Sequence, residues 1–196
     1  MRAEGRQQND PKSNREVLHQ LILQLGQSVV SDARIPDTAA VSVFIPASDA
    51  TDDSAIVRGA LLQSIRESGR KAFLRVDSLP PKEYLLSVGA SRTSVHYHDM
   101  FRDGFLGSKK VLRSISARLT CEIVNAASKE VLYSNTPSRA WIDTIMVDDI
   151  SRLERGAPAS GRAELPQEGF FDRAIEPFVI IGATGIAVFL FFHVRS

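Results

Sequence analysis

An uncharged apolar run late in the sequence constrains the fold of this chain more than any other feature. Residues 178–192 read FVIIGATGIAVFLFF, and with their flanking residues the run reaches about 18 residues, near the shortest helix that crosses the hydrocarbon layer of a bilayer. Every face of such a helix is apolar, which lipid tolerates and water does not. Pro177 suits the first turn of a helix, where its missing N–H costs nothing. We therefore expect residues 170–196 to form a single-pass membrane anchor, with the rest of the chain on one side of the bilayer.

Small residues give one side of the expected membrane helix a shallow groove. Ala183 and Ala187 have the small-xxx-small spacing that lets a second helix approach closely. The same residue types are common in membrane helices that contact only lipid, so helix packing within a homo-oligomer and plain lipid contact both stay open. The candidate packing residues are Gly182, Ala183, Gly185 and Ala187.

The charge balance and the cysteine count exclude several classes of function. The 24 lysines and arginines nearly cancel the 23 aspartates and glutamates, so no overall field steers the chain toward nucleic acid, and we expect no nucleic-acid partner. A single cysteine, Cys121, permits neither an internal disulfide nor a cysteine-based metal cluster within one chain. Residues 1–15 are polar and contain no apolar secretion signal, so we expect a disordered tail there and a domain on the cytoplasmic side of the membrane.

Apolar residues recur at helical spacing directly after this tail. They predict an amphipathic helix whose apolar stripe packs on the domain. Its polar face is mostly Gln; a membrane-surface helix, which would carry Lys and Arg there, is the alternative. The stripe consists of Val17, Leu18, Leu21, Ile22, Leu25 and Val29.

A strand, a helix and a second strand are expected in the next short stretch. Residues 40–45 are apolar and are followed by Pro46, as expected of a short strand buried on both faces. Residues 49–54 supply turn and N-cap groups, and Gly69 is placed to end the helix. Residues 71–76 then return as a strand, which suggests a right-handed crossover or a related α/β unit.

Strict alternation over residues 114–123 predicts a strand with one buried face and one wet face. Segments 84–97 and 130–135 are its expected neighbours in an antiparallel sheet, with residues 125–129 as a hairpin loop. Residues 141–147 are expected to add a last strand. The expected buried positions are Ile115, Ala117, Leu119, Cys121 and Ile123.

Together these elements predict an α/β (α+β) domain over residues 16–155, built from a small, mostly antiparallel sheet with helices on one face. Residues 148–155 should form a short helix at its end. Residues 156–169 read GAPASGRAELPQEG, whose glycines and prolines disfavour regular structure and predict a flexible linker to the anchor.

The order of these elements resembles a group of bacterial envelope proteins: the curli secretion lipoprotein CsgG, the TolB amino-terminal domain and FlgO-like flagellar proteins. The matching runs are VSVFIP at 41–46, EYLLSVG at 83–89 and the hairpin at 116–134. In that hairpin these families often carry an R-L-V-D-x-x-T-G-x-V-L-x-S type of run, and here Asn125 stands near the Asp and Ser128 near the Thr. The resemblance covers about residues 16–135 and implies a non-enzymatic module used for assembly in the cell envelope.

Few residues group as catalytic or metal sites do. His96 and His98 lie two apart on an expected strand, with Asp99 next, and they form the only grouping that resembles metal ligands. Polar residues on the wet side of a sheet are the alternative. Three loop carboxylates lack the spacing of a calcium loop, and helix capping explains them: they are Asp49, Asp52 and Asp53. We assign no catalytic residue, no metal and no cofactor.

The turn region 101–113 is the candidate surface for a partner. Gly104 and Gly107 flank a turn followed by cations that can meet an anionic headgroup or a phosphate, beside apolar side chains that can add a contact patch. A solvated hairpin loop is the alternative. The candidate partner-binding residues are Phe101, Phe105, Leu106, Lys109, Lys110 and Arg113.

Three functions from different classes stay open. The leading hypothesis is a membrane-tethered, non-enzymatic interaction or assembly module of the bacterial cell envelope, whose anchor in the lipid bilayer concentrates it near other membrane or envelope proteins. The second is a membrane-bound, metal-dependent enzyme or sensor that uses His96 and His98. The third is a structural subunit of a larger membrane complex, docked through the anchor helix.

Overall fold

The computed structural model describes residues 10–45, 52–75, 82–102, 107–166 and 191, and divides into two compact units, Met1–Glu164 and Leu165–Ser196. Within the described residues, no helix combines the length and the apolar character that crossing a bilayer requires. The predicted anchor lies outside the described residues except for Phe191. The four small residues proposed for helix packing, Gly182, Ala183, Gly185 and Ala187, lie outside them as well.

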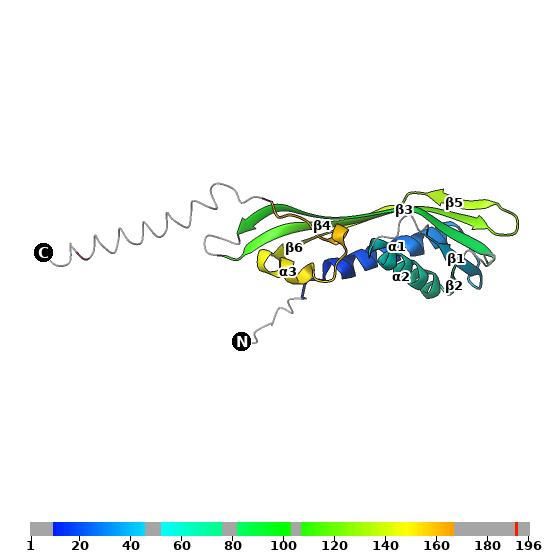
Figure 1. Cartoon of the computed structure of the whole chain (residues 1–196), viewed down its shortest axis with the longest axis horizontal. Coiled ribbons are helices and arrows are strands. Elements are labelled where there is room, and N and C mark those ends of the chain that lie inside the picture. The colour runs from blue at the N-terminus through cyan, green and yellow to red at the C-terminus, as the bar shows by residue number, and fades with distance from the viewer. Residues whose placement is uncertain (1–9, 46–51, 76–81, 103–106, 167–190, 192–196) are drawn as a thin grey trace, which may run out of the picture. The chain divides into compact units, whose positions relative to one another are not determined.

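The first unit is a mixed α+β domain in which helices cover one face of a six-stranded sheet (Figure 1). The strands follow the order β2-β1-β3-β4-β5, and β6 pairs with β4. The strands are β1 (Ala40–Phe44), β2 (Lys71–Leu74), β3 (Tyr84–Arg102), β4 (Lys109–Asn125), β5 (Val131–Asn135) and β6 (Ser138–Met146). The helices are α1 (Asn14–Asp32), α2 (Asp52–Glu67) and α3 (Ile150–Leu153), with short 3-10 turns at Val147–Asp149 and Ala159–Gly161.

The strand–helix–strand unit predicted for residues 40–76 is present. β1 and β2 are parallel and α2 connects them, with Val41 and Val43 fully buried in β1. Gly69 follows α2 with φ of +82°, a conformation that favours glycine and ends the helix as predicted. β1 is also parallel to β3, whereas β3, β4, β5 and β6 pair antiparallel. The sheet is therefore mixed, with its antiparallel part in the second half of the domain.

Apolar and polar residues alternate over residues 114–123, and β4 accordingly has one buried face and one exposed face. All five predicted inward positions are at most 1 % exposed and belong to the hydrophobic core, on the face of β4 that contacts α1. Glu122, Thr120 and Arg118 alternate with them and are exposed. Among the described residues, no helix covers the face on which these three lie; we call it the open face (Figure 1).

The domain begins earlier than the predicted boundary at residue 16, so the expectation of a disordered tail over residues 1–15 is wrong at its end. α1 starts at Asn14, and the hydroxyl of Ser13 accepts from the backbone N–H of Glu16 while the Glu16 carboxylate accepts from the Ser13 N–H. This capping box satisfies the free N–H groups of the first turn. Asn14 is fully buried.

The first part of the predicted flexible linker is also packed on the domain. Ala157 and Gly161 are buried, and a Cβ on Gly161 would lie 2.9 Å from the Cβ of Ala157 and 3.5 Å from Leu18 Cδ1. The small residues that suggested flexibility instead allow the chain to lie close to α1. The backbone N–H of Ala163 donates to Glu154 Oε1 over 3.2 Å, so order extends to that residue.

Candidate functional site

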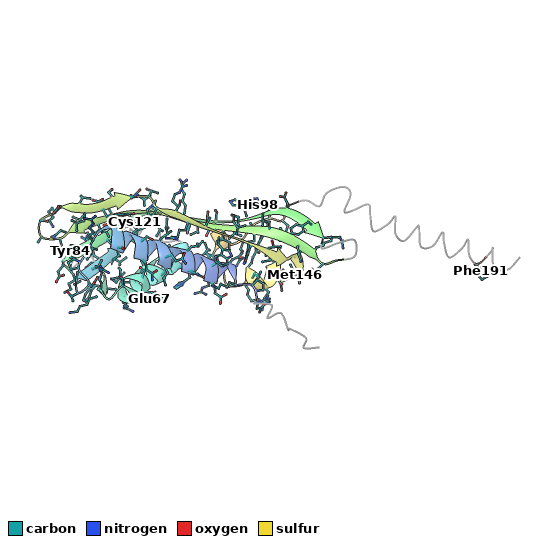
Figure 2. The ribbon with its side chains drawn as sticks, turned by 180° about the vertical axis from the view of Figure 1, so that it is seen from behind. Glu67, Tyr84, His98, Cys121, Met146 and Phe191 are labelled. Atoms are coloured by element: carbon teal, nitrogen blue, oxygen red, sulfur yellow. The ribbon has the colours of Figure 1, made fainter. Side chains whose placement is uncertain are left out.

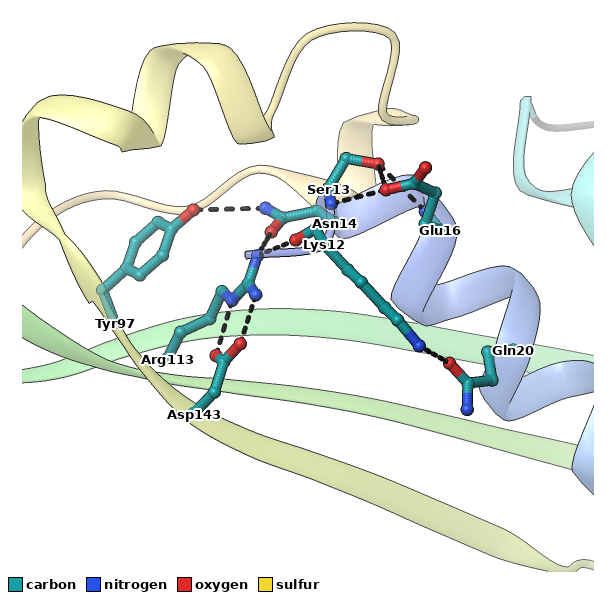
Figure 3. A network of polar contacts seen from close by, with 8 residues as sticks. All are labelled: Lys12, Ser13, Asn14, Glu16, Gln20, Tyr97, Arg113 and Asp143. Carbon is teal, nitrogen blue, oxygen red and sulfur yellow. Dashed lines mark hydrogen bonds and ion pairs between the residues drawn. The ribbon is translucent and has the colours of Figure 1, made fainter. Parts of the chain in front are cut away.

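Arg113, predicted to face a partner, is buried instead. Its side chain is 0 % exposed, and Nε and Nη2 donate to the two carboxylate oxygens of Asp143 on β6 over 2.8 and 2.5 Å (Figure 3). Nη1 donates to Asn14 Oδ1 over 2.6 Å and to the Lys12 carbonyl over 3.0 Å. A buried charge needs such partners, and with them it holds the start of α1 on the sheet. The prediction that Arg113 binds a partner is therefore wrong.

The polar network continues from Asn14 to Tyr97 of β3 and to the segment after α3. Asn14 Nδ2 donates to the Gly161 carbonyl over 2.8 Å and to the Tyr97 hydroxyl over 3.1 Å, and that hydroxyl donates to Glu154 Oε1 over 2.9 Å. Burial raises the pKa of Tyr97 to about 12, and the hydrogen bond to Glu154 acts in the same direction. These groups satisfy one another's hydrogen bonds, so the network ties α1, β3 and the segment after α3 together.

The other candidates in region 101–113 separate in the structure. Phe105 and Leu106 lie outside the described residues. In the antiparallel register of β3 and β4, Lys109 lies opposite Arg102 and Lys110 lies opposite Phe101. Because Lys110 alternates with the buried positions of β4, it shares the open face with Phe101, which is 43 % exposed. The structure thus brings together Phe101 and Lys110 on the open face.

An exposed apolar residue on β6 extends this surface, and the sequence analysis missed it. Ile142 is 65 % exposed and lies opposite Ser114, which in turn lies opposite His96. Leu112 is the diagonal neighbour of both Ile142 and Phe101, within reach of long side chains. We call the diagonal line of Ile142, Leu112 and Phe101 the apolar strip. The adjacent apolar pair Trp141–Ile142 was a signal, since consecutive residues of a strand face opposite sides.

Two arginines also face each other on the open face. Arg92 of β3 and Arg118 of β4 are register partners, and both are exposed. The hydroxyls of Ser94 and Ser116 form the next pair along these strands and are hydrogen bonded over 2.8 Å. Sequence reasoning did not find the arginine pair, because the register of two strands is invisible until the turn between them is known.

The histidine pair lies on the same face, as two residues spaced two apart in a strand should. The ring centroids of His96 and His98 are 6.3 Å apart and both side chains are exposed; Figure 2 shows His98 on the side of the sheet away from the helices. Across the parts of the chain that the structure describes, no three His, Cys, Asp or Glu side chains are placed to share a metal ion. Cys121 points into the core, where burial raises the pKa of its thiol to about 12.

The three loop carboxylates are only partly described. Asp49 lies outside the described residues, and Asp52 and Asp53 form the start of α2. Their side chains are not described, so the capping role predicted for them stays a prediction.

A cleft of about 740 Å³ opens between the first turns of α1 and α2 and the segment 156–158. Its lining combines the cationic Arg15 and the half-buried His19 with the apolar Ile56 and Pro158. Glu16 also lines it, but this carboxylate is held by the Ser13 backbone N–H and hydroxyl, which lower the pKa of Glu16. The described lining therefore offers no free carboxylate as a general base.

Comparison with known proteins gives only distant structural likenesses. No protein-family model matches the sequence, and no curated protein matches it at a significant level. A neuraminyllactose-binding hemagglutinin homolog from Helicobacter pylori has a TM-score of 0.36 at 14% identity, over 59% of this chain and 70% of its own. A minor lipoprotein from Acinetobacter baumannii gives 0.33 at 16% identity over 60% of this chain and 80% of its own. Lipoprotein B from Nitrosomonas europaea gives 0.33 at 14% identity over 64% of this chain and 72% of its own.

Proposed function

We propose that this chain is a membrane-tethered, non-enzymatic module that binds other proteins through the open face of its sheet. The observation that carries the proposal is the apolar strip. Three large apolar side chains on neighbouring strands form a continuous line on a face that no described helix covers. Single exposed apolar residues are ordinary on protein surfaces, but contiguous ones mark sites of association.

The tether of the proposed function is the apolar run 178–192, whose composition suits lipid on every helix face. A tethered domain meets partners at the membrane surface at a raised effective concentration, so a modest binding strip is sufficient. Together with the resemblance to envelope assembly families, this favours the bacterial cell envelope as the place of action and other membrane or envelope proteins as partners.

The binding strip is tested by comparing two apolar-to-charged variants of the full chain. Each form of the full chain is extracted in detergent and affinity-purified, and the proteins that co-purify with it are identified. The three forms are wild type, Ile142→Lys and Val131→Lys. Val131 is 53 % exposed on β5 and lies outside the apolar strip. Val131→Lys therefore adds the same charge and removes an exposed apolar side chain, as Ile142→Lys does, but at a different place. We expect Ile142→Lys to lose the companions and Val131→Lys to keep them. Equal recovery from both variants would contradict the proposal.

The tether is tested separately by flotation with phospholipid vesicles. We expect the full chain to float with the vesicles and the fragment 1–164 to stay at the bottom of the gradient. A full chain that remains monomeric in buffer without detergent, and does not float, would exclude the tether without affecting the binding strip.

A further inference from the structure

The facing pair Arg92 and Arg118 places two positive charges side by side on the open face. Directly opposed residues of an antiparallel pair have Cα atoms about 4.5 to 5.5 Å apart. Like charges at such positions repel and destabilise the sheet. A strand pair that folds with this arrangement carries an unfavourable interaction that opposite charge from outside would relieve.

Neither arginine is compensated within the part of the chain that the structure describes. Arg70, Arg113 and Arg152 each form an ion pair with an aspartate, whereas neither Arg92 nor Arg118 has a carboxylate of the described residues within ion-pair distance. The nearest acid on the same strand and face is Glu122, four residues beyond Arg118, which is about 13 Å along an extended strand. The positions around the pair carry Ser94, Ser116 and Ser138.

We propose that the Arg92–Arg118 pair receives carboxylates from an extended acidic segment of a partner protein. Guanidinium groups form paired hydrogen bonds with carboxylates, and neighbouring serine hydroxyls can donate to the remaining oxygens. This inference rests on the proposed function and names the chemistry of the partner. Ile142 lies beside Ser114, four residues from Arg118 along β4, so one extended segment can reach both if its acidic and apolar side chains are about 13 Å apart.

The number of cations favours a protein segment over a lipid surface. Lipid-binding clusters carry roughly four to eight lysines and arginines close together. The open face around this pair offers two arginines flanked by serines, a spacing that suits a pair of carboxylates. Binding to a lipid headgroup is nevertheless a distinct outcome that the experiment separates.

The test uses the full chain in neutral detergent and a fluorescent synthetic peptide. The peptide carries two alternate glutamates and a leucine four residues further on, and a control peptide has glutamines in place of the glutamates. The variant Arg92→Gln/Arg118→Gln is compared with Arg58→Gln/Arg66→Gln, which removes two exposed charges from α2 instead. We expect the first double variant to weaken binding at least about tenfold, as does the glutamine peptide, and the α2 variant to bind as wild type does.

Three outcomes would overturn the inference. They are equal binding by wild type and Arg92→Gln/Arg118→Gln, no measurable binding of the glutamate peptide to wild type, and binding of a fluorescent glycerol phosphate probe without binding of the peptide. The last would assign the pair to a lipid headgroup.

A stability measurement separates a binding role from a structural one. If the pair repels in the free protein, Arg118→Gln raises the urea midpoint; if the pair only supports the fold, the midpoint falls, which contradicts the inference. The proposed function fails independently. If Ile142→Lys retains the co-purifying proteins and peptide binding still depends on the two arginines, the binding role of the apolar strip is rejected. The binding role of the arginine pair then stands.

Discussion

The buried guanidinium of Arg113 acquires its role from its surroundings rather than from its charge alone. Its four hydrogen bonds go to Asp143, Asn14 and the Lys12 carbonyl, from two separate parts of the chain. A charge removed from water is tolerated only when its donors are satisfied, so each partner is constrained in turn. Arg118 lies on the same strand but faces the opposite side of the sheet, where its guanidinium is exposed to water. One residue type thus serves the fold at one position and is available to a ligand at the other.

Removing the charge of Asp143 tests this buried pair. We expect Asp143→Asn to lower the free energy of unfolding by about 2 to 4 kcal/mol, because it leaves the Arg113 charge buried and uncompensated while Asp143 itself is partly exposed. Urea unfolding followed by circular dichroism measures the change. Asp149→Asn is the control, since its ion pair with Arg152 is at the surface, where solvent screens it, and its loss should lower the free energy of unfolding much less. Equal losses in the two variants would contradict the assignment.

The thiol of Cys121 makes the stability of the domain sensitive to alkaline pH. Burial raises its pKa from 9.0 to about 12, so above pH 9 the unfolded chain releases a proton that the folded chain retains. This contribution to stability is complete below the unfolded pKa and is lost as the pH rises through the folded pKa. We expect the urea midpoint to fall between about pH 9 and about pH 12, and to fall less in Cys121→Ala, which lacks the group. Identical slopes in the two proteins would refute this.

At the scale of elements, the packing of α1 on α2 depends on one glycine. A Cβ on Gly26 would overlap the Oγ of Ser64 and lie 3.0 Å from the Ser64 Cβ; Ser64 is itself fully buried, and its hydroxyl donates to the Leu61 carbonyl. The two helices can approach this closely only because residue 26 has no side chain. Gly59 of α2 differs, since a Cβ there would meet nothing within 4 Å.

The two glycines should therefore respond oppositely to alanine. We expect Gly26→Ala to lower the free energy of unfolding by about 1 to 3 kcal/mol through overpacking. Gly59→Ala should be neutral or stabilising by up to about 1 kcal/mol, because alanine favours a helix. Thermal and urea unfolding of the two variants measure both effects. Destabilisation by Gly59→Ala as large as that by Gly26→Ala would show that the helix contact is not the cause.

The elements whose sequence period is regular were predicted, and those that depend on distant contacts were not. Apolar and polar residues alternate strictly along β4, so its buried face could be predicted from the sequence. Arg113 is two residues from Ile115 and therefore on the same face, so the same alternation should have placed it inside. The Arg92–Arg118 pairing depends on the irregularity between Tyr97 and Met100 and on the turn after β3. Gly161 looked like part of a linker, because composition alone cannot distinguish a flexible glycine from one required by close packing.

At the scale of the whole molecule, one buried network joins the two ends of the domain. Asn14 begins α1 and bonds the Gly161 carbonyl, while Tyr97 connects β3 to Glu154. The segment after α3 therefore belongs to the folded unit, which extends to Glu164.

Truncation at two points tests where the folded unit ends. We expect the fragment 1–164 to unfold cooperatively in urea, since it keeps every contact of the network. The fragment 1–155 lacks Ala157 and Gly161, which leaves Leu18 uncovered and the Asn14 amide without its carbonyl acceptor. Its free energy of unfolding should be lower by about 2 to 4 kcal/mol, the sum of lost apolar burial and an unsatisfied buried donor. Equal midpoints for the two fragments would mean that residues 156–164 contribute nothing to the fold, and that a flexible tether begins directly after α3.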